Sequence, residues 1–213
     1  MDGNISLKET EHKVFAAAVD DGLWDVLIAS FILVFAIAPL LSRRLGDFWS
    51  SFVFLPFWAL GYGAVRLIRK HVVNPRIGVV RFGQFRKMKL SRAAAILVVV
   101  NVVGLLLGIL VGQFSDRPGW VFLTPFALLM LTIFSVAGYY LGFPRLYVYG
   151  LLTALSPLVG EWLWVHRGAV HHGFPITFGT TAGIMVSIGL IKFALLLRNH
   201  PLRTSDPSSS VER

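Results

Sequence analysis

Four residues come nearest to a chemical site in this chain: Glu161, His166, His171 and His172. One carboxylate and three imidazoles within twelve residues offer the oxygen and nitrogen ligands that zinc and other divalent metals take. Their spacing departs from the i, i+4 histidine pair of helical zinc sites, and histidines near interfacial tryptophans are also typical of a membrane boundary. A divalent-metal or acid–base site and a purely structural loop are therefore both open.

Other signatures of catalysis are absent from the sequence. It contains no cysteine, no GxSxG nucleophile elbow, no HExxH motif and no glycine-rich phosphate loop. The sequence predicts no cofactor, with the divalent metal left open, and it favours a non-catalytic role. A membrane enzyme that uses Glu161 and the histidines is an alternative.

A second group of chemically active residues forms the basic segment RKHVVNPRIGVVRFGQFRKMKLSR, residues 69–92. It holds eight of the twenty Lys and Arg residues and no acidic residue. A solvated loop beside anionic headgroups would have this composition, and so would a specific site for a lipid headgroup, a nucleotide or an acidic protein. Nucleic acid is not expected, because no recognition module or stacking array accompanies the charge. The predicted lipid- or partner-binding residues are Arg76, Arg81, Arg86, Lys87, Lys89, Arg92 and Arg145.

Composition shows what must position these residues. A content of 55% apolar residues and a mean hydropathy of +0.70 are typical of an integral membrane protein. Apolar runs of about twenty residues can cross a bilayer, and the chain has six. We predict an all-α bundle with spans at about residues 23–41, 48–68, 93–112, 120–142, 146–165 and 174–197.

The distribution of cations predicts the orientation. If both termini are cytoplasmic, sixteen of the twenty Lys and Arg residues lie inside and four lie outside. Cytoplasmic loops carry the excess of cations, so this orientation is expected. The net charge of +9 then reflects the inner face of the membrane.

Three segments outside the spans have their own predicted structure. Residues 1–21 carry a capping box at Ser6 and Glu9 and predict a short interfacial helix. In the basic segment, Pro75 is expected to end the second span, and IGVVRF with FRKMKL predicts a cytoplasmic β-like hairpin. The polar tail 201–213 is expected to be disordered, which leaves residues 22–200 as the membrane domain.

The chain also resembles itself at a shift of 69 residues. Seven positions are identical between the two copies, among them Pro56 with Pro125 and Arg76 with Arg145. The pattern predicts a tandem repeat of two spans followed by a cytoplasmic Pro-Arg, in which both copies cross the membrane in the same direction. The prolines are expected to kink their helices.

Small residues predict where helices pack closely. Glycines at four-residue spacing let backbones approach each other in a membrane. The predicted packing residues are Gly104, Gly108 and Gly112 in the third span and Gly179 and Gly183 in the sixth. These faces could meet within one chain or in a homo-oligomer.

The stretch PRIGVV, Pro-Arg-x-Gly-x-Val after a hydrophobic hairpin, resembles a family of bacterial multi-pass membrane proteins that has no assigned activity. The resemblance implies a bacterial plasma membrane and supplies no catalytic residue. The chain also resembles the substrate-capture subunits of vitamin transporters in size. We therefore expect a membrane interaction, sensing or transport-accessory module that contacts anionic lipid or an acidic partner. A small transporter or substrate-binding subunit is the alternative.

Overall fold

The computed structural model describes residues 21–77, 84–112 and 119–201, and all of its regular structure is helical. Its elements are α2 (Leu23–Leu45), α3 (Asp47–Phe52), α4 (Phe54–Ile68), η1 (Arg69–Val73), α5 (Asn74–Ile77), α6 (Gln84–Gly112), α7 (Gly119–Leu141), α8 (Arg145–Arg167), η2 (Val170–Gly173) and α9 (Phe174–Asn199). Among these residues, six helical segments are long and apolar enough to cross a membrane. This confirms the predicted multi-pass, all-α architecture.

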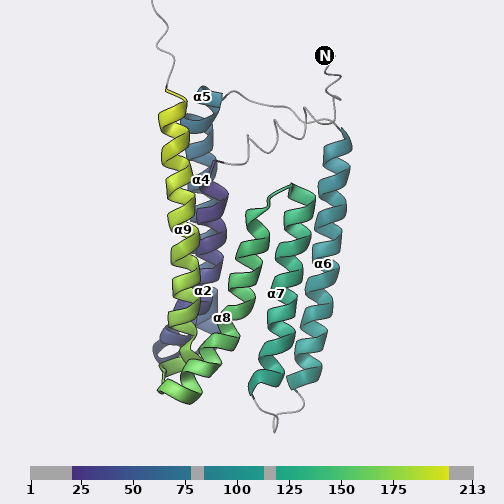
Figure 1. The fold of residues 1–213 in the computed structure, drawn as a ribbon, viewed down its shortest axis with the longest axis vertical. Coiled ribbons are helices and arrows are strands. Elements are labelled where there is room, and N and C mark those ends of the chain that lie inside the picture. The colour runs from purple at the N-terminus through teal and green to yellow at the C-terminus, as the bar shows by residue number, and fades with distance from the viewer. Residues whose placement is uncertain (1–20, 78–83, 113–118, 202–213) are drawn as a thin grey trace, which may run out of the picture.

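The bundle has an inner group of helices and two outer ones. The buried core is built from α2, α7, α8 and α9, with Ile32, Phe134, Tyr149, Phe178 and Met185 among its members. α2 packs along α9 more extensively than along any other element (Figure 1). By contrast, only 6% of the apolar window is buried in the second span and in α6. These two spans therefore lie at the periphery.

Glycines in the left-handed region of the backbone end or begin several helices. Gly46, with φ 76°, ends α2 and donates its N–H to the carbonyl of Ser42. Gly168, with φ 65°, ends α8, where its N–H and that of Ala169 satisfy the last carbonyls. Such residues let the chain turn back at the end of a span without strain.

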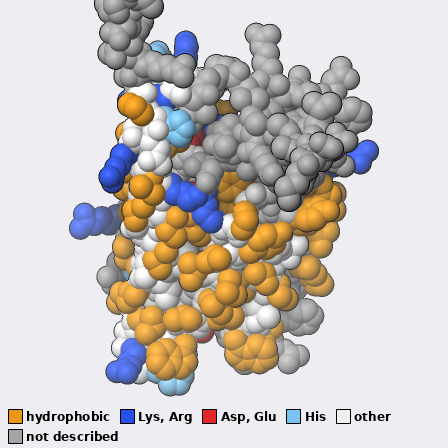
Figure 2. Space-filling model, turned by 45° about the horizontal axis from the view of Figure 1, so that its top comes forward, with side chains coloured by type: hydrophobic (Ala, Val, Ile, Leu, Met, Phe, Trp, Pro, Cys, Tyr) orange, Lys and Arg blue, Asp and Glu red, His pale blue; other side chains and the backbone are white. Residues whose placement is uncertain are grey.

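One end of the bundle collects charge. α2 begins there, α5 and α9 end there, and the turn between α7 and α8 lies on the same side (Figure 1). Hydrophobic side chains cover the middle of the face drawn in Figure 2, and most of its Lys and Arg side chains lie above them. We call this the charged end; it holds Asp21, Asp25, Arg69, Arg76, Arg145 and Arg198.

The basic segment differs from its prediction. FRKMKL forms the first turns of α6 instead of a strand, and the described residues of the segment contain no strand. Lys, Arg, Met and Leu all favour helix, and an apolar helix follows directly, so one continuous helix is favoured over a hairpin. Residues 78–83, which include most of IGVVRF, lie outside the described residues. Residues 1–20 of the predicted interfacial helix and residues 202–213 of the predicted tail also lie outside them.

Pro75 does not end the second span, which stays helical from Phe54 to Ile77 through α4, η1 and α5. The turns before it widen into the π-helix η1, where the N–H of Asn74 bonds the carbonyl of Arg69. A wider turn gives the proline ring room that an α-helix lacks, which is why the helix continues. Pro56 follows a break at Val53, whereas α7 runs unbroken through Pro125.

Candidate functional site at the charged end

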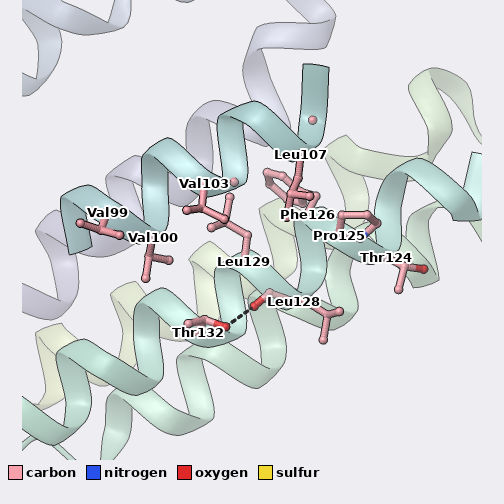
Figure 3. A pocket seen from close by; sticks show the side chains of 12 residues that line it. Val99, Val100, Val103, Leu107, Thr124, Pro125, Phe126, Leu128, Leu129 and Thr132 are labelled. Atoms are coloured by element: carbon pink, nitrogen blue, oxygen red, sulfur yellow. Dashed lines mark hydrogen bonds between the residues drawn. The ribbon is translucent and has the colours of Figure 1, made fainter. Parts of the chain in front are cut away.

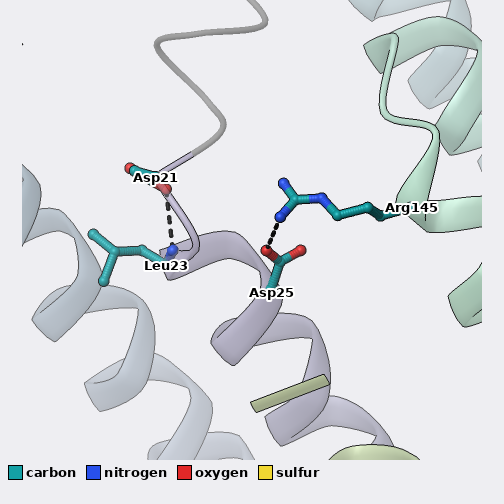
Figure 4. A network of polar contacts seen from close by, with 4 residues as sticks. All are labelled: Asp21, Leu23, Asp25 and Arg145. Carbon is teal, nitrogen blue, oxygen red and sulfur yellow. Dashed lines mark hydrogen bonds and ion pairs between the residues drawn. The ribbon is translucent and has the colours of Figure 1, made fainter. Parts of the chain in front are cut away.

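A buried ion pair joins the start of α2 to the start of α8. Arg145 donates from Nη1 to Oδ2 of Asp25 at 2.8 Å (Figure 4). The Asp25 side chain is 2% exposed and that of Arg145 is 20% exposed. The guanidinium also lies 5.1 Å from the centre of the Phe143 ring. Arg145, predicted to bind lipid or a partner, is thus engaged within the protein.

A second ion pair lies just outside the first span. Nη2 of Arg69 lies 2.9 Å from Oδ2 of Asp21. Oδ1 of Asp21 accepts the backbone N–H of Leu23 at 3.1 Å (Figure 4). The Asp21 side chain is fully buried. Burial raises the pKa of the Asp21 carboxyl, and the Arg69 charge and the hydrogen bonds oppose that rise without cancelling it. The end of the second span is therefore tied to the start of α2.

A close backbone contact holds α2 and α9 together beside these acids. Gly22 has φ 77°, and a Cβ added there would overlap the carbonyl oxygen of Gly189. A Cβ on Gly189 would lie 2.7 Å from the carbonyl oxygen of Gly22. Only glycine fits at either position. Sequence reasoning missed this contact because the two residues stand alone, without the four-residue spacing of a packing motif.

The predicted packing glycines have different surroundings. A Cβ on Gly104 would lie 2.6 Å from the Leu129 side chain, so α6 and α7 meet closely there. A Cβ on Gly179 would only reach Ala36 at 3.9 Å, and around Gly108 and Gly183 nothing lies within 4 Å. No contact is described for Gly112. Close packing within the chain is thus seen at Gly104.

The predicted basic residues separate into three groups. Arg145 is ion-paired, and Arg76 donates from Nη1 to the carbonyl of Val72 at 3.0 Å. The buried Nε of Arg76 makes no hydrogen bond to any described residue. Four other predicted positions, 86, 87, 89 and 92, belong to the backbone of α6, and we call them the basic collar. Arg81 lies outside the described residues.

The collar continues a membrane span without interruption. α6 has 29 residues, but its apolar stretch covers only Ser91–Leu110. Residues 84–90 extend the same helix by about 10 Å at 1.5 Å per residue. That length is enough to cross the headgroup layer on one side of a bilayer, about 5–8 Å thick. At 100° per residue, the four collar positions are distributed around the helix rather than along one side.

At the opposite end, the α8–α9 turn brings together two of the four residues proposed for metal. Nδ1 of His172 lies 2.8 Å from Oε2 of Glu161, and the imidazole packs on Trp164 with centroids 4.2 Å apart. His166 instead bonds the carbonyl of Trp162 in its own helix at 3.0 Å. Among the described residues, no three His, Cys, Asp or Glu side chains form a group that could hold a metal ion.

This turn has an unusual backbone. His171 and His172 have φ 51° and 54°, in the left-handed region that non-glycine residues rarely adopt. A Cβ on Gly160 would lie 2.7 Å from the carbonyl of His172, so the turn rests directly on α8. The close fit and the Glu161 contact hold the turn in place.

A large groove runs between α6 and α7. Its volume is about 700 Å³, and its lining is almost entirely apolar, including Val103, Leu107, Pro125 and Leu128 (Figure 3). Thr132, which also lines it, donates its hydroxyl to the carbonyl of Leu128 at 2.8 Å. A hydrocarbon chain would fit this groove better than a polar solute would.

Comparison with protein-family models, with curated proteins and with solved structures yields no match for this chain.

Proposed function

We propose that this protein is a non-catalytic membrane module that contacts anionic lipid headgroups through the basic collar of α6, in an interaction, sensing or transport-accessory role. The observation that carries the proposal is the continuity of α6, whose cationic first turns extend directly from an apolar span. Cations held at headgroup depth gain up to about 1 kcal/mol each from an anionic leaflet.

Lipid suits the collar better than an acidic protein does. The four positions face all sides of a helix whose apolar stretch is itself only 6% buried. Lipid headgroups surround such a helix, whereas a folded protein would approach it from one side. The Nε of Arg76, which has no hydrogen-bond partner among the described residues, offers a further donor for a phosphate at the same end. An acidic partner is then the alternative that the test must separate.

The test replaces the four collar residues Arg86, Lys87, Lys89 and Arg92 by Gln. Native mass spectrometry in mild detergent would count bound phosphatidylglycerol against phosphatidylcholine at 0.05 and 0.5 M salt. Because each of the four cations contributes up to about 1 kcal/mol, the variant should show a large loss of preference for the anionic lipid at low salt. At high salt the loss should be small, since salt screens the attraction. The matched control is the same change at Arg43, Arg44, Arg117 and Arg167, the four cations expected on the opposite side.

Equal anionic-lipid retention by the variant and the control would refute direct lipid binding by the collar. A pull-down with the same variant would then separate a protein-docking surface from a simple orientation signal.

We further propose that the charged end faces the cytoplasm of a bacterial plasma membrane. The excess of cations at that end supports this orientation. Because the chain has no cysteine, single cysteines can be labelled from outside intact cells. Position 171 is expected to react and position 81 to be protected; the reverse result would overturn the proposal.

The predicted tandem repeat is also part of this proposal. Arg76 and Arg145 both lie at the charged end, as a parallel repeat requires. An experimental structure would test it by superposing the pair formed by α2 and the second span on the pair formed by α6 and α7. Superposition in the same membrane direction would support the repeat, and superposition only in opposite directions would refute it.

A small transporter or substrate-binding subunit is the second candidate function, and the groove between α6 and α7 favours it. Its apolar lining suits a lipid-like cargo. A brominated fatty acid that quenches tryptophan fluorescence would test occupancy, with Thr132→Trp as the reporter. An unquenched reporter would exclude this cargo class.

A divalent metal at Glu161 and His172 is the third candidate, in which the protein could also act as a membrane enzyme. The two side chains already meet, and water or a further residue would have to complete the coordination. Calorimetric titration with Zn²⁺ would test it, since Glu161→Gln is expected to abolish any heat from a site built on this pair.

A further inference from the structure

We propose that α6 is the contact helix of a homodimer, in which the Asn101 side chains of two copies hydrogen-bond to each other near the middle of the membrane. This interaction goes beyond the lipid contact proposed above and concerns a different part of α6.

Asn101 is in a place where a carboxamide is costly. It lies at the centre of the apolar stretch Ser91–Leu110 and is exposed at the periphery of the bundle. Its Nδ2 donates to the carbonyl of Leu97 at 2.8 Å, and within the described chain its Oδ1 accepts no hydrogen bond. In hydrocarbon no water can satisfy that oxygen, so the isolated chain bears the cost of an unmade hydrogen bond.

The residues around Asn101 repeat like a helix-packing seam. Positions 94, 98, 101, 105 and 108 alternate by four and three residues, the spacing of a two-helix coiled coil. All five are exposed, with Val98 at 62% and Leu105 at 64%. Nothing lies within 4 Å of a Cβ built on Gly108, which leaves room for a second backbone. α7 packs on the adjoining side of α6, against Gly104, and its Leu129 lines a shallow hollow with Asn101, Leu105 and Gly108.

A second copy of this chain is the occupant that fits best. All copies share one orientation, so a two-fold axis between them must run along the membrane normal. Identical residues of the two α6 helices then lie at the same depth, and Asn101 meets Asn101. A carboxamide is both donor and acceptor, so the two side chains can satisfy each other. A single asparagine in an apolar seam is also a known determinant of register and oligomeric state.

Disulfide crosslinking in native membranes tests the seam. Val98→Cys and Leu105→Cys are expected to form covalent dimers on mild oxidation. Leu106→Cys is the matched control, because Leu106 is similarly exposed, at 59%, but lies off the seam. Crosslinking at 106 equal to that at 98 and 105, or none at any position, would overturn the proposal. So would crosslinked products with the mass of a different protein.

Dissociation in lipid vesicles tests the asparagine. Asn101→Leu is expected to raise the dimer dissociation constant about three- to twenty-fold, the range for one membrane hydrogen bond. Gly108→Leu is expected to block the approach, whereas Gly63→Leu, also with nothing within 4 Å of its Cβ, leaves the dimer intact. Single-molecule photobleaching counts the copies. A monomeric wild type, or an unchanged dissociation constant in Asn101→Leu, would refute the inference.

Discussion

Replacing Arg145 by Met should destabilise the protein more than replacing Asp25 by Asn does. The two side chains form one ion pair at 2.8 Å, yet their surroundings differ. Asp25 is 2% exposed, so the loss of Arg145 leaves a carboxylate charge in the protein interior without this counter-ion. Arg145 is 20% exposed and sits at the end of its helix, where its long side chain can turn toward water.

The magnitudes follow from this asymmetry. Removing one partner of a buried pair costs about 3–5 kcal/mol, and we expect Arg145→Met near the lower end of that range. A hydrogen bond to a charged group contributes about 1.5–3 kcal/mol to stability. Because Arg145 can be partly rehydrated, the destabilisation by Asp25→Asn should lie at or below the lower limit of that range. The double variant should cost less than the sum of the two single ones, because both remove the same interaction.

Intrinsic tryptophan fluorescence during heating in detergent would rank the variants. Arg198→Met is the matched control, since Arg198 is an exposed arginine at the same end. It should leave the unfolding temperature unchanged. Equal destabilisation by Arg145→Met and Asp25→Asn, or an additive double variant, would refute the reasoning.

Two further predictions concern neighbouring residues. Gly22→Ala should destabilise strongly, because its Cβ would overlap the carbonyl of Gly189 at a backbone with φ 77°. Gly63→Ala should be neutral or stabilising. Thermal unfolding measures both variants, and equal effects would contradict the close contact. The raised pKa of Asp21 means that the folded state holds a proton that the unfolded state releases. The stability of wild type relative to Asp21→Asn should therefore fall as the pH rises from about 4 through the folded pKa, and a relative stability that rises instead would exclude burial as the dominant cause.

The six spans could be predicted because each is marked within its own stretch of sequence. A run of about twenty apolar residues between charged or glycine-rich turns needs no partner to be recognised, and the predicted limits of 174–197 and 146–165 lie within α9 and α8. The charge bias at the end that holds Arg69 was equally readable, because it is a property of composition.

The contacts at the charged end could not be predicted in the same way. In the expected topology Asp25 lies near several cations, so the sequence does not decide with which of them it forms an ion pair. Its bond to Arg145 spans 120 residues. The prediction of a strand at residues 85–90 is wrong because it rests on a few alternating residues and leaves out the long apolar helix that follows them. Pro75 was expected to end a helix, but a π-turn that ends at Val73, two residues before it, accommodates it.

The contact of α2 with α9 has a consequence for how the protein is made. Of the six spans, the first one synthesised has the last one as its most extensive neighbour. At about 5–20 residues per second, the 120 residues between Asp25 and Arg145 take about 6–24 s to synthesise. During that time the carboxylate of Asp25 has no Arg145 to meet. The start of α2 must therefore wait in a hydrated position near the membrane surface, or beside an insertion factor, and it can settle into the bundle only once α8 and α9 have arrived.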